Sequence, residues 1–228
     1  MRGSFPKLGH IQAASGIVFA LFLSLHLLTT MSAVFGIDAY DRTLGSLRNL
    51  YRPHIAVELA LIGGSSVIHV ACAVWQFVRR RKVVQATGPW WLRAHRLSGY
   101  FLLIVILGHV LATRIAPLLS TGPTATEAAD FSFLAYATLW APWFFWPYYL
   151  LLGLCGSLHL GFGLYLSAKI LRLRSGVSSS GPSRLETSAT LVLSMFVLCG
   201  VLGILLRSSS APTQRFPEFR ALSQRILR

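Results

Sequence analysis

The sequence predicts an all-α integral membrane protein with five transmembrane helices. Of its 228 residues, 54% are hydrophobic and only 12% are charged, whereas soluble domains carry about 25% charged residues. A chain this apolar cannot cover its surface with polar groups, which excludes a water-soluble globular domain, and it is too hydrophobic to be intrinsically disordered. Five apolar stretches reach the roughly 20 residues that a helix needs to cross the hydrocarbon core of a membrane.

We expect one transmembrane domain over residues 1–228. Pro53 and Pro142 stand at predicted helix starts, where proline is tolerated, and the basic stretch Arg93 to Arg96 precedes the third span. A basic tail follows the last span, and its segment from Phe216 to Arg228 suits either an interfacial helix or a solvated end. The predicted spans are residues 10–35, 54–78, 97–119, 143–168 and 187–206, and the tail is 208–228.

The distribution of cations predicts the orientation of the five spans. The N-terminus, the 79–96 segment and the 169–186 segment share one side, which holds 12 cations and one acidic residue. The other side holds nine cations and six acidic residues, so the net charges are +11 and +3. The positive-inside rule then places the first side in the cytoplasm or, in an organelle, the matrix. The overall charge of +14 therefore reflects topology and membrane lipids, and no nucleic-acid partner is expected.

Four histidines lie well inside the predicted spans, one on each of the first four. Ionisable residues are costly inside a membrane and by default mark function. At a helical rise of about 1.5 Å per residue, His69 and His159 lie about 15 Å from the basic side, and His26 and His109 about 20–24 Å from it. The depths therefore predict two pairs, His26 with His109 and His69 with His159. His10, His54 and His95 fall at helix ends, where ordinary interfacial roles are expected.

Two such pairs are what bis-histidine ligation of up to two b-type haems requires, because facing helices must present one imidazole to each face of the iron. Hydrogen bonds across helices are the alternative role for these histidines. Arg96 and Arg114 are candidates to hold the haem carboxylates through bidentate hydrogen bonds, with interfacial lipid contact as the alternative. Glu58, the only carboxylate within a span, is either a proton-transfer or quinone-contacting group or a carboxylate that snorkels to the interface.

An internal repeat supports this pairing. The run that begins at His10 resembles the run that begins at His95, and within them Ser15, Gly16 and His26 match Ser98, Gly99 and His109 at an offset of 83 residues. The segment that ends at His69 matches the one that ends at His159 at an offset of 90. Spans one and two thus correspond to spans three and four with the same topology, which predicts a parallel two-helix repeat. The expected architecture is a cytochrome-b-like four-helix bundle with a fifth helix added.

The layout resembles two related families. The third span, with His95-Arg-Leu-Ser-Gly-Tyr, Gly108-His109-Val and Thr113-Arg114, is similar to the dihaem cytochrome b membrane anchor of succinate dehydrogenase and fumarate reductase. That resemblance implies haem ligation at the two histidine pairs, and electron transfer between an iron–sulfur partner and quinone. An acidic residue that some fumarate reductases use for proton transfer is replaced here by Ser157.

The closer resemblance is to the mitochondrial adaptor transmembrane-domain family of the fungal mitochondrion–vacuole lipid pathway. It rests on the 50-residue interval between His109 and His159, on its segments Glu127 to Phe133 and Trp140 to Tyr149, and on the basic tail. That family implies a membrane adaptor in mitochondrial lipid homeostasis, with a lipid-transfer protein as partner. The long cytosolic N-terminal region of the fungal adaptor has no counterpart before the first span.

Two functions are therefore expected from the sequence. The first is a non-enzymatic adaptor in a mitochondrial membrane. The alternative is a haem-binding anchor in a bacterial inner membrane, working with flavoprotein and iron–sulfur subunits and with quinone. Because no nucleophile–base pair, phosphate-binding loop or carboxylate pair is present, the chain is expected to be at most an electron-transfer subunit of an oxidoreductase.

Overall fold

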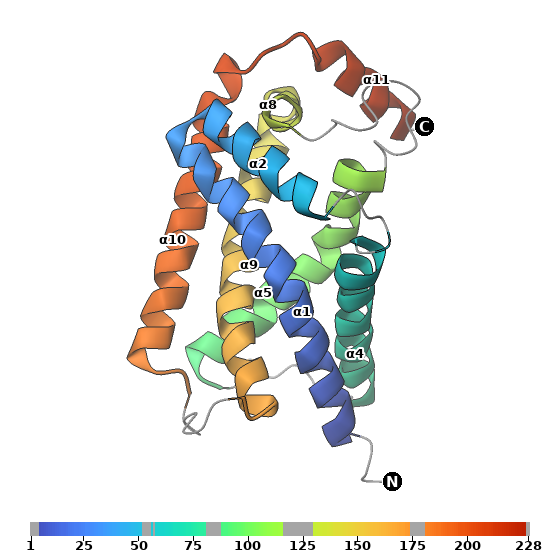
Figure 1. The fold of residues 1–228 in the computed structure, drawn as a ribbon, viewed down its shortest axis with the longest axis vertical. Coiled ribbons are helices and arrows are strands. Elements are labelled where there is room, and N and C mark those ends of the chain that lie inside the picture. Colours follow the sequence, from blue (N-terminus) through green and yellow to red (C-terminus); the bar gives the residue numbers. More distant parts are fainter. Residues whose placement is uncertain are drawn as a thin grey trace.

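A computed structural model describes residues 5–51, 56, 58–80, 88–115, 130–173 and 181–226 of the chain. Every regular element within these ranges is a helix (Figure 1). The long helices are α1 (Phe5–Ser32), α4 (Ser65–Arg80), α5 (Trp90–Val110), α9 (Pro142–Ile170) and α10 (Arg184–Arg207). The shorter ones are η1 (Ala33–Phe35), α2 (Ile37–Tyr51), η2 (Glu58–Gly64), η3 (Leu111–Ile115), α8 (Phe131–Trp140), η4 (Ser208–Ser210) and α11 (Phe216–Ile226).

Five of the described helical segments are long and apolar enough to cross a membrane, which confirms the predicted number of spans. They are Leu8–Phe35, Glu58–Arg79, Trp90–Ile115, Pro142–Ile170 and Arg184–Ser210. The third span begins at Trp90 rather than Leu97, because Arg93 to Arg96 lie within α5; long basic side chains can reach the interface from inside a helix. The predicted boundaries at residues 54 and 119 lie outside the described residues.

The start of the fifth span at Arg184, earlier than the predicted residue 187, has a local cause. The Ser183 hydroxyl accepts a hydrogen bond from the backbone N–H of Glu186 at 3.2 Å, and the Glu186 carboxylate accepts one from the backbone N–H of Ser183 at 2.7 Å. This capping box satisfies two backbone donors that a helix start leaves without partners.

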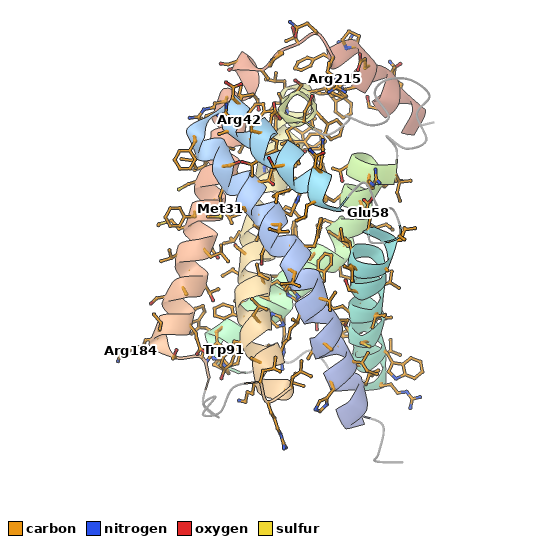
Figure 2. All side chains as sticks on the ribbon, in the orientation of Figure 1. Met31, Arg42, Glu58, Trp91, Arg184 and Arg215 are labelled. Carbon is orange, nitrogen blue, oxygen red and sulfur yellow. The ribbon has the colours of Figure 1, made fainter. Side chains whose placement is uncertain are left out.

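The spans pack as two helix pairs joined along one seam. Helix α4 packs along α1, α5 packs along α9, and α1 and α9 join the two pairs. Helices α4 and α5 meet much less closely. In the most apolar 18-residue stretches of their two spans, only 11% and 6% of the stretch is buried inside the protein, against 39% for α9. Figure 1 shows the N-terminus at the lower end of the bundle and the C-terminal segment at the upper end. We call these the inner and the outer end; Trp91 and Arg184 lie at the inner end and Arg42 and Arg215 at the outer end (Figure 2).

Helix α10 lies directly against α1 because glycines remove side chains from the contact. A Cβ atom at Gly200 would overlap the Thr30 carbonyl oxygen, and one at Gly203 would lie 2.7 Å from the Ala33 carbonyl oxygen. Small residues permit this approach of backbones inside membranes. The fifth span therefore packs against α1 as well as α9.

A small helical layer covers the outer end of the bundle, and we call α2, α8, η4 and α11 the outer cap (Figure 1). Its core contains Tyr40 and Leu44 of α2 and Phe131 and Ala135 of α8. Helix α11 packs onto α8 through Phe219, which is only 2% exposed and contacts the rings of Phe133 and Tyr136. The part of the tail described by the structure thus packs against protein rather than extending as a solvated end.

Polar contacts fix α8 within the outer cap. The Asp130 carboxylate accepts a hydrogen bond from the backbone N–H of Phe133 at 3.1 Å and forms an ion pair with Arg215. The Asp41 carboxylate of α2 accepts a second one, from the backbone N–H of Phe131, at 2.9 Å. These bonds satisfy N–H groups that the start of a helix leaves without partners. Residues from three separate segments therefore hold α8 in place.

Candidate functional site

The structure brings the four intramembrane histidines together in two facing pairs. His26 of α1 faces His109 of α5, with ring centroids 6.0 Å apart and ring planes at 72°. His69 of α4 faces His159 of α9, with centroids 6.1 Å apart and planes at 87°. A metal–imidazole bond is about 2.0–2.1 Å long, so two imidazoles on opposite sides of one metal ion have centroids roughly 6–6.5 Å apart. Both pairs have a spacing that suits a shared metal ion. We call them the outer pair (His26, His109) and the inner pair (His69, His159).

Backbone carbonyls orient both imidazoles of the inner pair. His69 Nδ1 lies 3.0 Å from the Gln12 carbonyl oxygen of α1, and His159 Nδ1 lies 3.1 Å from the His95 carbonyl oxygen of α5. Because a carbonyl oxygen can only accept, each Nδ1 carries the proton and each Nε2 keeps its lone pair, assuming neutral rings. Metal-ligating histidines almost always donate their second ring N–H in this way. The inner pair is thus in the tautomer that binds a metal.

Two glycines make room for these imidazoles. A Cβ atom at Gly16 would lie 2.9 Å from His69 Nδ1, and one at Gly99 would lie 2.9 Å from His159 Cε1. Both distances are shorter than real Cβ contacts, so any larger residue would push the ring away from its carbonyl. Each glycine lies four residues after the residue whose carbonyl accepts the hydrogen bond. Each imidazole ring therefore packs directly against the backbone of the neighbouring helix, α1 for His69 and α5 for His159.

A serine in each half binds the same carbonyl. Ser15 Oγ donates to the Gln12 carbonyl at 3.1 Å, and Ser98 Oγ donates to the His95 carbonyl at 3.0 Å. We call the serine, the glycine, the carbonyl and the imidazole together the carbonyl–imidazole unit. Its two copies correspond at the same offsets of 83 and 90 residues that relate the sequence repeats. The two halves of the structure therefore share the imidazole–carbonyl contact as well as the sequence motif.

The outer pair has different neighbours. His109 Nδ1 lies 3.3 Å from the Tyr148 hydroxyl, and the His26 ring stacks on Phe22 at 5.9 Å between centroids. Tyr148 belongs to α9 and stacks in turn on Phe144. A tyrosine hydroxyl thus stands at the outer pair where the inner pair has a backbone carbonyl, which gives the two pairs different polar surroundings.

Glu58 and Arg114 form an ion pair at the outer ends of the second and third spans. Their side chains are 14% and 25% exposed, and each lies in a π-helical turn, a feature that occurs frequently at functional sites. Arg114 follows His109 by five residues on the same span. The two residues had separate predicted roles, and the pairing links them near the outer histidines. Arg96, the other predicted carboxylate-binding residue, is half-buried near the inner end of α5.

The position of His95 differs from the expected one. It was expected at an interface, yet its ring is partly buried and stacks on His159 with centroids 4.3 Å apart and planes at 13°. Because α5 begins at Trp90, His95 lies more than a turn inside the helix. The alignment of His95 with the repeat was visible in the sequence, but the direction of its side chain was not. His10 is exposed, and His54 lies outside the described residues.

The number of protein ligands distinguishes between kinds of metal site. Within the described ranges, no three His, Cys, Asp or Glu residues come together to hold a metal ion. Zinc sites use three or four protein ligands, whereas a haem iron that has its porphyrin nitrogens needs only two axial ones. Two imidazoles per position therefore fit haem better than a bare metal ion.

Comparison of the chain with protein-family models, with curated protein sequences and with solved structures gives no match. The assignment of a function therefore rests on the geometry of the site.

Proposed function

We propose that the chain is a dihaem membrane cytochrome of the b type, in which the inner and outer pairs each hold one haem. The observation that carries this proposal is the pair of facing imidazoles at 6.0 and 6.1 Å between ring centroids. The glycines under His69 and His159 support it, since each leaves a cradle that a Cβ atom would fill. The weak contact between α4 and α5 supports it too, because a large planar group between the helix pairs would bury more of both spans.

The residues of this chain would position the haems and separate them by depth. Haem, when bound, supplies one-electron redox chemistry. His69 and His159 would each offer an Nε2 lone pair held in place by a carbonyl–imidazole unit. His26 and His109 would be the two ligands nearer the outer end. A centre near each side of the membrane would let electrons cross the apolar layer in two short steps.

The Glu58–Arg114 ion pair is the place where we expect a quinone to exchange protons. A quinol that gives up two electrons also releases two protons, so it needs a nearby group that can accept them. Glu58 is the only acidic residue within the described spans on the side of the outer pair, and Arg114 holds its carboxylate. Electrons would then pass between this end and an iron–sulfur partner at the basic inner end. This arrangement is that of a membrane anchor of succinate dehydrogenase or fumarate reductase.

The adaptor function in mitochondrial lipid homeostasis is a second candidate, and one observation favours it. Two segments that carry the resemblance to the adaptor family pack together in the outer cap, where the ring of Phe133 contacts that of Phe219 in the tail. A folded outer cap of this kind suits contact with a protein partner, such as a lipid-transfer protein. This function does not require the histidine pairs to bind anything.

A visible difference spectrum tests the haem proposal. The chain is purified in detergent from a haem-replete host, and the dithionite-reduced minus oxidised spectrum is recorded with haem quantified per protein. We expect two b-type haems, of which His26→Ala loses one and His69→Ala loses the other, because each pair then lacks an axial ligand. His10→Ala is the matched control, since His10 is an exposed histidine of the same helix as His26. A colourless wild-type protein would contradict the proposal and favour the adaptor function.

A further inference from the structure

The inner pair has a third imidazole beside it, and the outer pair has none among the described residues. His95 supplies the carbonyl that holds His159 Nδ1, and its own ring stacks nearly parallel on the ring of His159 at 4.3 Å. The glycine at 163 makes this possible, because a Cβ atom there would lie 3.2 Å from His95 Cε1. His95 therefore contacts a predicted axial ligand twice, through its backbone and through its side chain.

The first repeat has a glutamine, not a histidine, at the position that corresponds to His95. Gln12 corresponds to His95, and its carbonyl holds His69 just as the His95 carbonyl holds His159. The Gln12 side chain, however, accepts a hydrogen bond from Gln76 Nε2 at 2.5 Å. The carbonyl contact thus needs no particular side chain, since any residue has a carbonyl. The stacked ring of His95 is an addition that the repeat does not require.

The stacked ring presents an aromatic face to His159, with the two ring planes 13° apart. Its Nδ1 is buried and has no hydrogen-bond partner within the described part of the chain, so no hydrogen bond from this atom competes with the stacking. Positive charge over an aromatic face is favoured, and a ligating imidazole carries more positive charge when its metal is oxidised.

We propose that His95 is a positioning residue that fixes the His159 ring and lowers the reduction potential of the inner centre relative to the outer one. This inference rests on the proposed dihaem function. The stacked face stabilises the oxidised form of the inner centre and leaves the outer centre unaffected, because His95 contacts only the inner pair. His95 thereby gives the two otherwise similar bis-histidine sites different electron affinities.

The test is a redox titration of the full-length protein in detergent, followed optically. The His26→Ala and His69→Ala variants assign each spectral component to its pair. His95→Gln installs the residue of the first repeat and keeps the carbonyl, so the inner haem should remain bound while its midpoint potential shifts to a more positive value. His95→Phe keeps a stacked ring and should bring the potential back toward that of the wild type. The outer haem of the same sample is the internal control.

The outcomes separate this inference from the proposed function. A wild-type chain without haem overturns both. With two haems bound, an inner potential that is unchanged in His95→Gln, or an equal shift at both haems, overturns the role of His95 and leaves the dihaem function standing. Loss of the inner haem in His95→Gln supports the positioning role if His95→Phe retains that haem, and overturns it if His95→Phe loses it as well.

Discussion

Gly16 and Gly99 determine how closely an imidazole approaches the helix that orients it. Neither residue ligates anything, and both lie where a methyl group would contact a histidine ring at 2.9 Å. The role of these two glycines is therefore geometric: they keep the carbonyl of the preceding turn open to a side chain from another helix. A glycine in a helix interior costs roughly 1 kcal/mol relative to alanine, so its presence here indicates a contact that alanine would block.

Replacement of this glycine should weaken haem binding. Gly16→Ala is expected to displace the His69 ring, break its hydrogen bond to the Gln12 carbonyl and lower haem affinity at the inner pair by about 10–100-fold, the usual effect of losing such a support. Haem per protein, measured during detergent dilution, gives the affinity. Gly9→Ala on the same helix is the control, because a Cβ atom there has no neighbour within 4 Å. Equal haem retention in both variants would refute the carbonyl–imidazole unit.

Asp41 makes the stability of the outer cap depend on pH. Burial raises the pKa of its carboxyl, with the nearby Asp130 and Asp38 adding to the effect, while the hydrogen bond from Phe131 and the Arg48 guanidinium oppose it. A raised pKa in the folded state means that the charged carboxylate lowers the free energy of unfolding at neutral pH. This penalty disappears as the pH falls from the raised pKa to below the unfolded value of about 3.9.

Asp41→Asn removes the charge and keeps an oxygen that can accept the Phe131 N–H. We expect the variant to unfold at a higher temperature than the wild type at pH 7, with the difference shrinking as the pH is lowered toward 4. Thermal unfolding in detergent, followed by tryptophan fluorescence, measures this. Asp38→Asn, on the exposed side of the same helix, removes one of the charges that raise the Asp41 pKa and should give a smaller change of the same sign. A difference that grows on acidification would show that the assigned sign is wrong.

At the scale of residues, the sequence allowed prediction of which histidines meet but not of how they are held. The depth of a residue along a span follows from its position in the sequence and from the constant rise per residue of an α-helix. The hydrogen bonds to the Gln12 and His95 carbonyls depend on helix rotation, and no periodicity in these nearly all-apolar spans fixes that rotation. Arg114 and Glu58 were singled out separately for the same reason, since their ion pair joins two spans.

Among the helices, α10 depends on a close backbone contact. Gly200→Ala would place a methyl group on the Thr30 carbonyl oxygen, so α10 must shift away from α1. Overpacking of this kind lowers the free energy of unfolding by about 1–3 kcal/mol. The higher helix propensity of alanine offsets only part of this loss. Unfolding in a denaturing-detergent titration should therefore begin earlier for Gly200→Ala. The neighbouring variant Cys199→Ala, at an exposed position, should behave as the wild type does, and a Gly200→Ala protein of unchanged stability would contradict the contact.

Two helices of the outer cap, α2 and α8, were not predicted from the sequence, whereas α11 was one of two alternatives for the tail. Helix α2 is amphipathic, with Tyr40 and Leu44 buried one turn apart, and a search for helical periodicity would have found it. Helix α8 has only ten residues, all but a few apolar, and its composition alone does not distinguish it from part of a longer span. Its start depends on Asp130, which pairs with the distant Arg215, and on Asp41 of α2, and its end on the turn before Pro142.

For the whole molecule, the positive-inside rule makes a topology prediction. Leu173 and Gln214 are exposed positions at the inner and the outer end, respectively. In a background without the three native cysteines, a membrane-impermeant maleimide applied from outside should label Gln214→Cys and leave Leu173→Cys unlabelled until the membrane is opened. The inverse labelling pattern would mean that the basic segments face outward, against the charge bias of +11 to +3. Labelling of both sites in sealed vesicles would contradict an odd number of spans.

The five spans were the easiest part to predict, because each is an apolar stretch of sufficient length in the sequence. The packing of those spans was harder to predict. The α1–α9 seam is close, whereas its counterpart between α4 and α5 is loose, with the Phe77–Tyr100 ring contact at 6.1 Å among its few links. This difference arises between segments whose sequences look equally apolar.

The doubled carbonyl–imidazole unit has a consequence for how such a protein can originate. Each histidine pair takes one residue from the first repeat and the corresponding residue from the second, so in a symmetric dimer of two identical copies both pairs would lie on the twofold axis. A residue on a twofold axis meets its own copy. A single two-helix peptide would therefore need only to dimerise to assemble both sites, with His26 facing His26 and His69 facing His69. Fusion of two copies into one chain would leave these sites intact and would free each copy to vary separately, and Gln12 and His95 are different residues at corresponding positions of this kind.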